Sequence, residues 1–180
     1  MAVGQHSTVA LGLHGAATRR KALLSIHIAA AVALLGTSSG LLVAALRAAT
    51  RGDLQQAHAL YELMRLSTYS LGIPFSFIAL GAGVLLGLTS KWGIVRYWWV
   101  TSKLALLLAT IVIGALLTGP NIDGMVKATS PGRIGDDTAK WTVAAAVGSQ
   151  IALILCATIL AVFKPGGPRG GWRRRGRKER

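Results

Sequence analysis

The chain has 180 residues, of which 52% are hydrophobic and 14% are charged, and its mean hydropathy is +0.52. So small a charged fraction cannot cover the surface of a soluble globular protein, and it favours an integral membrane protein. The formal net charge of +14 would suggest a nucleic-acid partner in a soluble protein. In a membrane protein, the distribution of that charge matters more than its size.

Residues 1–21 are predicted to be a short cytoplasmic tail. The first 18 residues are small and polar, contain two widely spaced histidines and show no usable periodicity, so we expect them to be disordered. Three basic residues, 19–21, then precede an apolar run, as in a secretory signal peptide. That run exceeds the roughly 7–15 residues of a signal peptide and ends without a clear cleavage site, so it is interpreted as a retained helix.

Four apolar stretches without a formal charge follow along the chain. Each is long enough to cross a hydrocarbon core of roughly 30 Å, which needs about 20 helical residues. The stretches are residues 22–46, 66–90, 104–122 and 141–163. The predicted fold is an all-α, four-transmembrane-helix bundle over residues 22–163, with helices at about 22–46, 67–89, 98–118 and 141–163.

Two of the loops differ in character. The first contains a short additional helix, because Asp53 and Gln56 form a capping box and apolar residues then recur on one helix face. This helix either lies on the outer membrane surface or extends the second crossing outward. The third loop, residues 119–140, contains Gly-Pro, Pro-Gly and three carboxylates without calcium-loop spacing, and is predicted to be mostly irregular.

Small residues at four-residue spacing predict close helix packing in every crossing. These stripes are Gly36, Gly40 and Ala44; Ala79, Gly83 and Gly87; Thr110, Gly114 and Thr118; and Ala144, Gly148, Ala152 and Cys156. For Gly36 and Gly40 we favour packing within the chain over homodimerisation, the alternative that would make a homo-oligomer. Cys156 is interpreted as inert packing. Pro74 is expected to kink or start the second crossing, and Gln150 to hydrogen-bond a neighbouring helix.

The basic residues are distributed unevenly. With four crossings both termini share a side, and 14 of the 20 lysines and arginines lie on that side. The positive-inside rule therefore places the termini and the second loop in the cytoplasm and the protein in the cytoplasmic membrane. The basic C-terminal tail, residues 164–180, is predicted to contact anionic lipid headgroups, so no nucleic acid is expected. The residues for this contact are Arg173, Arg174, Arg175, Arg177 and Lys178.

Aromatic residues mark the predicted ends of the crossings, since amphipathic rings prefer the membrane interface. They are Trp92, Trp98, Trp99, Tyr69 and Trp141.

Two ionisable residues lie within the predicted crossings. His27 is about one turn into the first helix and Lys103 about one turn into the third, so they share a leaflet and a similar depth. Structurally, the lysine would snorkel to the headgroups and the histidine would donate to a backbone carbonyl. Functionally, they would line a cytoplasmic-side pocket, with His27 ligating a haem or a metal and Lys103 facing an anionic group. A bis-histidine haem is disfavoured, because no second histidine lies in a crossing.

The sequence from Leu88 to Leu104 contains Lys-Trp-Gly and Trp-Val-x-x-Lys elements. Together with the helical first loop and Pro74, it resembles an uncharacterised, largely actinobacterial family of four-helix membrane proteins, for which no activity is implied. More distantly, His27 followed by Gly36 is similar to copper-resistance D type and haem-binding protoporphyrinogen oxidase type membrane domains. That resemblance implies His27 and Lys103 as cofactor-binding residues.

The sequence contains no Ser/His/Asp arrangement, phosphate-binding loop or Cys/His cluster. The leading hypothesis is therefore a non-enzymatic, multi-pass membrane component of unknown molecular function. The competing hypothesis is a haem-linked or metal-linked redox protein that uses His27 and Lys103. A small-solute transporter is disfavoured, because four helices in one chain offer little room for a path.

Overall fold

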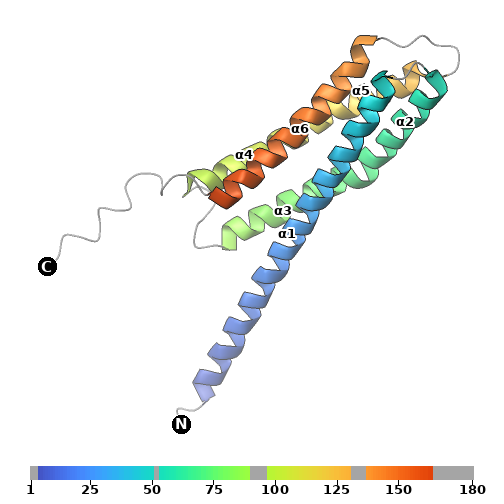
Figure 1. Cartoon of the computed structure of the whole chain (residues 1–180). Coiled ribbons are helices and arrows are strands. Elements are labelled where there is room, and N and C mark those ends of the chain that lie inside the picture. The colour runs from blue at the N-terminus through green and yellow to red at the C-terminus, as the bar shows by residue number, and fades with distance from the viewer. Residues whose placement is uncertain (1–3, 51–52, 90–96, 131–136, 164–180) are drawn as a thin grey trace.

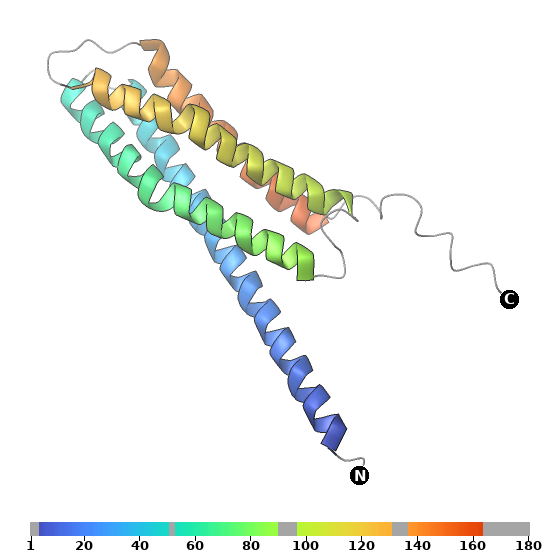
Figure 2. The ribbon, with the colours of Figure 1, turned by 180° about the vertical axis from the view of Figure 1, so that it is seen from behind.

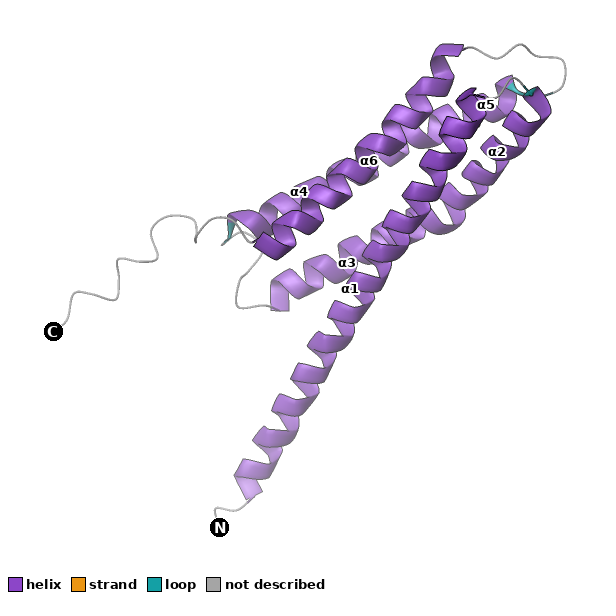
Figure 3. Ribbon diagram, in the orientation of Figure 1, coloured by secondary structure: helices purple, strands orange, loops and turns teal. Residues whose placement is uncertain are grey.

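The structure is a computed structural model that describes residues 4–50, 53–89, 97–130 and 137–163, with side chains described from residue 18 onward except at residues 137 and 138. Figure 1 shows these residues as long helices running up and down in one bundle. In chain order the elements are α1 (Gly4–Thr50), α2 (Leu54–Ser67), η1 (Thr68–Gly72), α3 (Ile73–Thr89), α4 (Trp98–Ile113), η2 (Gly114–Thr118), α5 (Gly119–Ala128) and α6 (Asp137–Phe163). The described residues form helices almost throughout (Figure 3).

Four of these helical stretches are long and apolar enough to cross a membrane. They are Thr18–Thr50, Leu54–Thr89, Trp98–Ala128 and Ala139–Phe163. This confirms the predicted all-α, four-helix membrane fold. The second stretch has 36 residues and the third 31, or about 54 and 46 Å at 1.5 Å per residue. Both therefore exceed a hydrocarbon core of roughly 30 Å.

The extra length belongs to α2 and α5, which continue the second and third crossings outward. Of the two possibilities for the first-loop helix, the structure shows the extension, because α2 runs through η1 into α3 without a break. Asp53 caps α2, and its side chain accepts from the backbone N–H of Gln55 at 3.0 Å, one residue before the Gln56 of the predicted capping box. The prediction of a mostly irregular third loop is wrong for Gly119–Ala128, which is helical.

A π turn precedes a proline in both long helices. The Ile73 N–H donates to the Thr68 carbonyl ahead of Pro74, and the Gly119 N–H donates to the Gly114 carbonyl ahead of Pro120. A proline inside an α-helix lacks an N–H and clashes with the carbonyl four residues back. The wider i, i+5 turn changes the hydrogen-bond register at that point. The helix therefore passes through both prolines.

The N-terminal prediction also needs correction. The backbone is helical from Gly4, so α1 extends well before the first apolar stretch instead of following a disordered tail. The segment contains no proline and several alanines and leucines, which are good helix formers. An existing helix also adds further residues at low cost, because nucleation is the unfavourable step.

The apolar core lies in the half of the bundle that contains α2 and α5, away from the N-terminal end of α1 and the C-terminal end of α6 (Figures 1 and 2). We call this half the outer half and the other the inner half. The core residues are Leu41, Ala45, Ala48, Ala57, Tyr61, Met64, Ile122, Met125, Val126, Val143, Ala144 and Val147. In the inner half, α1 pairs mainly with α3, and α4 with α6.

The small-residue stripes behave differently in the four crossings. Ala79 and Gly87 in the second and Thr110 and Thr118 in the third are buried, as predicted. In the fourth only the beginning of the stripe is buried, and Ala152 and Cys156 are exposed.

Intramolecular packing through Gly36 and Gly40 is wrong. Both glycines are exposed, and a Cβ added at either would meet nothing within 4 Å. The packed face of α1 instead follows another row, which comprises Ala30, Leu34, Ser38, Leu41, Ala45 and Ala48. Homodimerisation through the two glycines stays a prediction.

Candidate functional site

His27 bridges α1 and α3 near the inner end of the bundle. Its Nδ1 lies 2.9 Å from the carbonyl oxygen of Ala79, so that nitrogen carries the proton and donates. Gly83 makes the contact possible, because a Cβ there would lie 3.1 Å from Cε1 of the imidazole. The ring therefore rests against bare backbone on α3. This is the structural role that the sequence suggested for His27.

Lys103, on α4, is half-buried and close enough to His27 to act on it electrostatically. The two residues are therefore brought to the same region of the inner half, as their positions in parallel crossings predicted. Among the described residues, the Lys103 ammonium has no hydrogen bond or ion pair. The assignment of His27 and Lys103 as cofactor-binding residues stays a prediction.

Gln150 connects the fourth crossing to the third, as predicted. Its Nε2 donates to the Thr110 carbonyl at 3.1 Å, and its Oε1 accepts from the Thr118 hydroxyl at 3.1 Å. A Cβ at Gly114 would lie 3.0 Å from the same Nε2. The amide thus spans the π turn η2 from one side to the other and holds it against α6.

Gln150 belongs to a layer of polar residues that borders the apolar core on the side of the inner half. Ser38, Thr68 and Thr118 are buried one helical turn inward from core residues of their own helices, and Gln150 follows core residue Val147 by three positions. Within the described part of the chain, the Thr68 hydroxyl is buried without a hydrogen-bond partner. The layer separates the packed outer half from the inner half.

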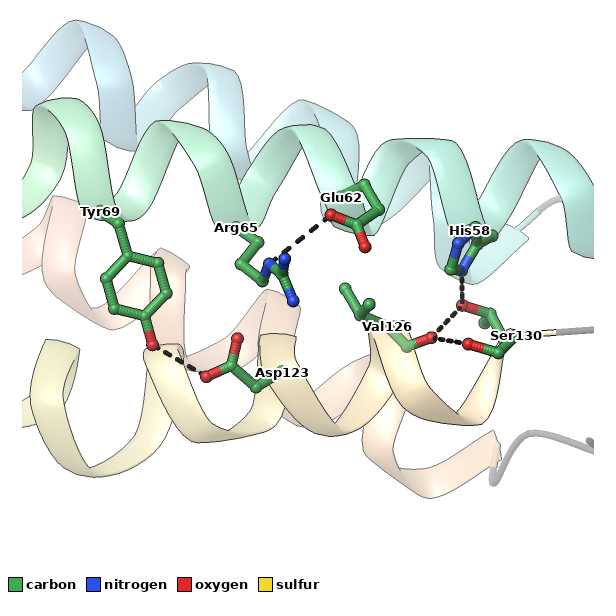
Figure 4. Close-up of polar contacts among 8 residues, drawn as sticks. His58, Glu62, Arg65, Tyr69, Asp123, Val126 and Ser130 are labelled. Carbon is green, nitrogen blue, oxygen red and sulfur yellow. Dashed lines mark hydrogen bonds and ion pairs between the residues drawn. The ribbon is translucent and has the colours of Figure 1, made fainter.

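Sequence reasoning missed a row of polar side chains on α2 and η1. Figure 4 shows His58, Glu62, Arg65 and Tyr69 along the side of this helix that faces α5. The Tyr69 hydroxyl donates to Asp123 at 2.8 Å, and Arg65 pairs with Glu62 at 3.5 Å. The signal was present, because the i, i+4, i+7, i+11 spacing places all four on one face.

A shallow surface hollow of about 400 Å³ lies over the same part of the helix. It is lined by Glu62, Leu63, Arg65, Leu66 and Tyr69. All of these come from one continuous helix, and the arginine and glutamate that line it already pair with each other. The hollow is therefore a poor candidate for a specific small-molecule site.

The pair His58 and Thr129 combines a base with a hydroxyl, at 3.0 Å. The buried Thr129 hydroxyl, however, lies 2.7 Å from the Met125 carbonyl and donates its proton there. It must therefore accept from His58, so the histidine cannot act as a base that activates it. The contact joins α2 to the end of α5 and is structural.

Histidine, cysteine, aspartate and glutamate do not gather in groups of three or more suited to a metal anywhere in the described segments. Of the predicted interface aromatics, Tyr69, Trp98 and Trp141 are exposed and Trp99 is half-buried, while Trp92 lies outside the described residues. The lipid-contact residues at 173–178 also lie outside them. Their roles stay predictions.

No family model, curated protein or solved structure matches the chain.

Proposed function

We propose that this protein is a non-catalytic, multi-pass component of the bacterial cytoplasmic membrane, with both termini in the cytoplasm and the α2–α5 end outside. The proposal rests on the four long apolar helices and on the excess of basic residues on the side of the membrane that holds both termini. The resemblance to an actinobacterial four-helix family supports the bacterial assignment.

The hydrogen bonds that the polar side chains make to other helices and to the backbone support a structural role for them. The Thr129 hydroxyl donates to a carbonyl, Gln150 is bonded on both sides, and Tyr69 is bonded to a carboxylate. A nucleophile needs a base that can accept its proton. In the His58–Thr129 pair, the histidine donates to the threonine hydroxyl and so cannot accept its proton. We therefore interpret these groups as connections between helices.

Purification from membranes tests this proposal. We expect the protein to stay in the membrane pellet after carbonate extraction and to be colourless and free of stoichiometric metal after purification in detergent. A stoichiometric Soret band, or one equivalent of bound metal by elemental analysis, would overturn the non-catalytic assignment. Release by carbonate would overturn the membrane assignment.

A second candidate is a haem-linked or metal-linked redox protein, and the His27 hydrogen bond favours it. Metal-ligating histidines usually donate their other ring N–H to a carbonyl or carboxylate. His27 donates through Nδ1, which leaves Nε2 as the nitrogen that would ligate. In this case the wild-type protein would show a Soret band that His27→Ala abolishes and His58→Ala, on the outer half, retains. The absence of the band in wild type would exclude a haem.

A further inference from the structure

No described residue compensates the charge of Lys103 within the bundle. Lys103 is half-buried, and among the described residues it has neither an ion-pair partner nor a hydrogen-bond acceptor. It also acts electrostatically on His27, which packs against α3. Lys103 on α4 and His27 on α1 therefore lie in the same region of the inner half.

The chain offers almost no anion that could pair with it. Of the six acidic residues, five lie on the side of the membrane that holds the first and third loops: Asp53, Glu62, Asp123, Asp136 and Asp137. The sixth, Glu179, lies outside the described residues. The described charged residues of the inner half are all basic, with Arg19, Arg20 and Lys21 on α1. Among the described residues, no acidic side chain lies in the inner half with Lys103, which favours an anion from outside the chain.

The depth of Lys103 indicates which anion this is. It follows Trp98, the first residue of α4, by five positions, or about 8 Å along the axis. Helical side chains lean toward the N-terminus, which here is the membrane interface. The ammonium therefore approaches the level of the headgroup phosphates. The N-terminus of α4 adds the positive end of a helix dipole nearby.

We propose that Lys103 binds the phosphate of an anionic phospholipid from its own leaflet, held between α4 and the α1–α3 pair beside His27. This differs from general snorkelling, in which the ammonium would reach any headgroup around the protein. The hydrogen bond from His27 to Ala79 fixes the imidazole as one wall of the site. The proposal requires that the chain cross the membrane four times. It does not depend on which side of the membrane is cytoplasmic or on a bound cofactor.

Native mass spectrometry of the detergent-solubilised full chain tests the proposal. The protein is mixed with equal amounts of phosphatidylglycerol and phosphatidylcholine with identical acyl chains. We expect wild type to retain phosphatidylglycerol preferentially and Lys103→Gln to lose about five-fold in that preference, since a basic residue contributes about 1 kcal/mol to anionic-lipid attraction. Lys103→Arg should keep it. The control Lys127→Gln removes an exposed lysine of the outer half and should also keep it.

Several results would overturn the proposal. One is equal retention of the two lipids by wild type, and another is an unchanged preference in Lys103→Gln. Displacement of the lipid by millimolar inorganic phosphate would assign the site to a soluble anion instead. Because Lys103→Gln could misfold, a second measurement uses wild type alone in vesicles. Brominated phosphatidylglycerol should quench its tryptophan fluorescence more than brominated phosphatidylcholine, and equal quenching would contradict the site.

Discussion

At the scale of single residues, the clearest result is the pairing of His27 with Gly83. The sequence suggested a histidine donating to a backbone carbonyl, but not which carbonyl, because partner choice depends on how α1 and α3 pack. The structure identifies Ala79 and explains Gly83, which leaves space for the imidazole. Gly83 is therefore small because it makes room for the His27 ring, which helix periodicity alone could not predict.

Replacing Gly83 tests this contact. Gly83→Val would force the imidazole off Ala79, because a Cβ would already lie 3.1 Å from Cε1. We expect a loss of about 1–3 kcal/mol in the free energy of unfolding, as for other overpacked sites. Gly81→Val is the matched control, since Gly81 is on the same helix with nothing within 4 Å of an added Cβ. Equal stability of the two variants in detergent unfolding would contradict the contact.

Gln150 was predicted to bond a neighbouring helix, and it does. The sequence could not show that its partners flank a π turn, since the turn results from Pro120 and its context in the fold. Gln150→Leu should cost roughly 1 kcal/mol of unfolding free energy, because interhelical hydrogen bonds in membranes average about 0.6 kcal/mol and two are lost. The measurement is unfolding by SDS titration.

The control for Gln150 is Thr158→Val on the same helix. Thr158 is exposed and bonds only its own helix, at the Ile154 carbonyl. We expect little change in its unfolding free energy. A Gln150→Leu variant as stable as Thr158→Val would show that the Gln150 bonds do not hold α6 to α4.

At the scale of elements, the main departure from the sequence prediction is α5. Gly119 and Pro120 are ordinary signals of a helix end, so the third crossing was expected to finish near residue 118. The π turn accommodates the proline, and the Asn121 side chain donates to the Leu117 carbonyl at 2.7 Å. Packing against α2 then buries Ile122, Met125 and Val126. That tertiary contact cannot be deduced from local composition.

Crosslinking tests the packing of α5 on α2. In a Cys156→Ala background, the pair His58→Cys and Thr129→Cys replaces side chains that touch at 3.0 Å. We expect a short bifunctional thiol reagent to join them efficiently within one chain. The control pairs His58→Cys with Gly124→Cys, because Gly124 is exposed on α5 and a Cβ there would meet nothing within 4 Å. Equal yields from the two pairs would indicate a mobile loop instead of a packed helix.

At the scale of the whole molecule, the bundle has two unlike halves. The outer half has a dense apolar core around Tyr61, Met64 and Val147. The inner half separates into helix pairs and contains Lys103, which has no partner among the described residues. The number of crossings followed from the sequence, because hydropathy and helix length determine it directly. The packed faces did not, because alanine and glycine are frequent on every side of these helices, as exposed Gly36 and Gly40 show.

We propose a four-crossing protein whose α2–α5 end lies outside the cytoplasm. In the Cys156→Ala background, single cysteines are placed at Gln56, exposed on α2, and at Thr89, exposed at the inner end of α3. A membrane-impermeant maleimide applied to intact cells should label the cysteine at 56 at once and the cysteine at 89 only after permeabilisation. The reverse pattern would contradict the orientation, and labelling of both in intact cells would contradict an odd number of crossings between them.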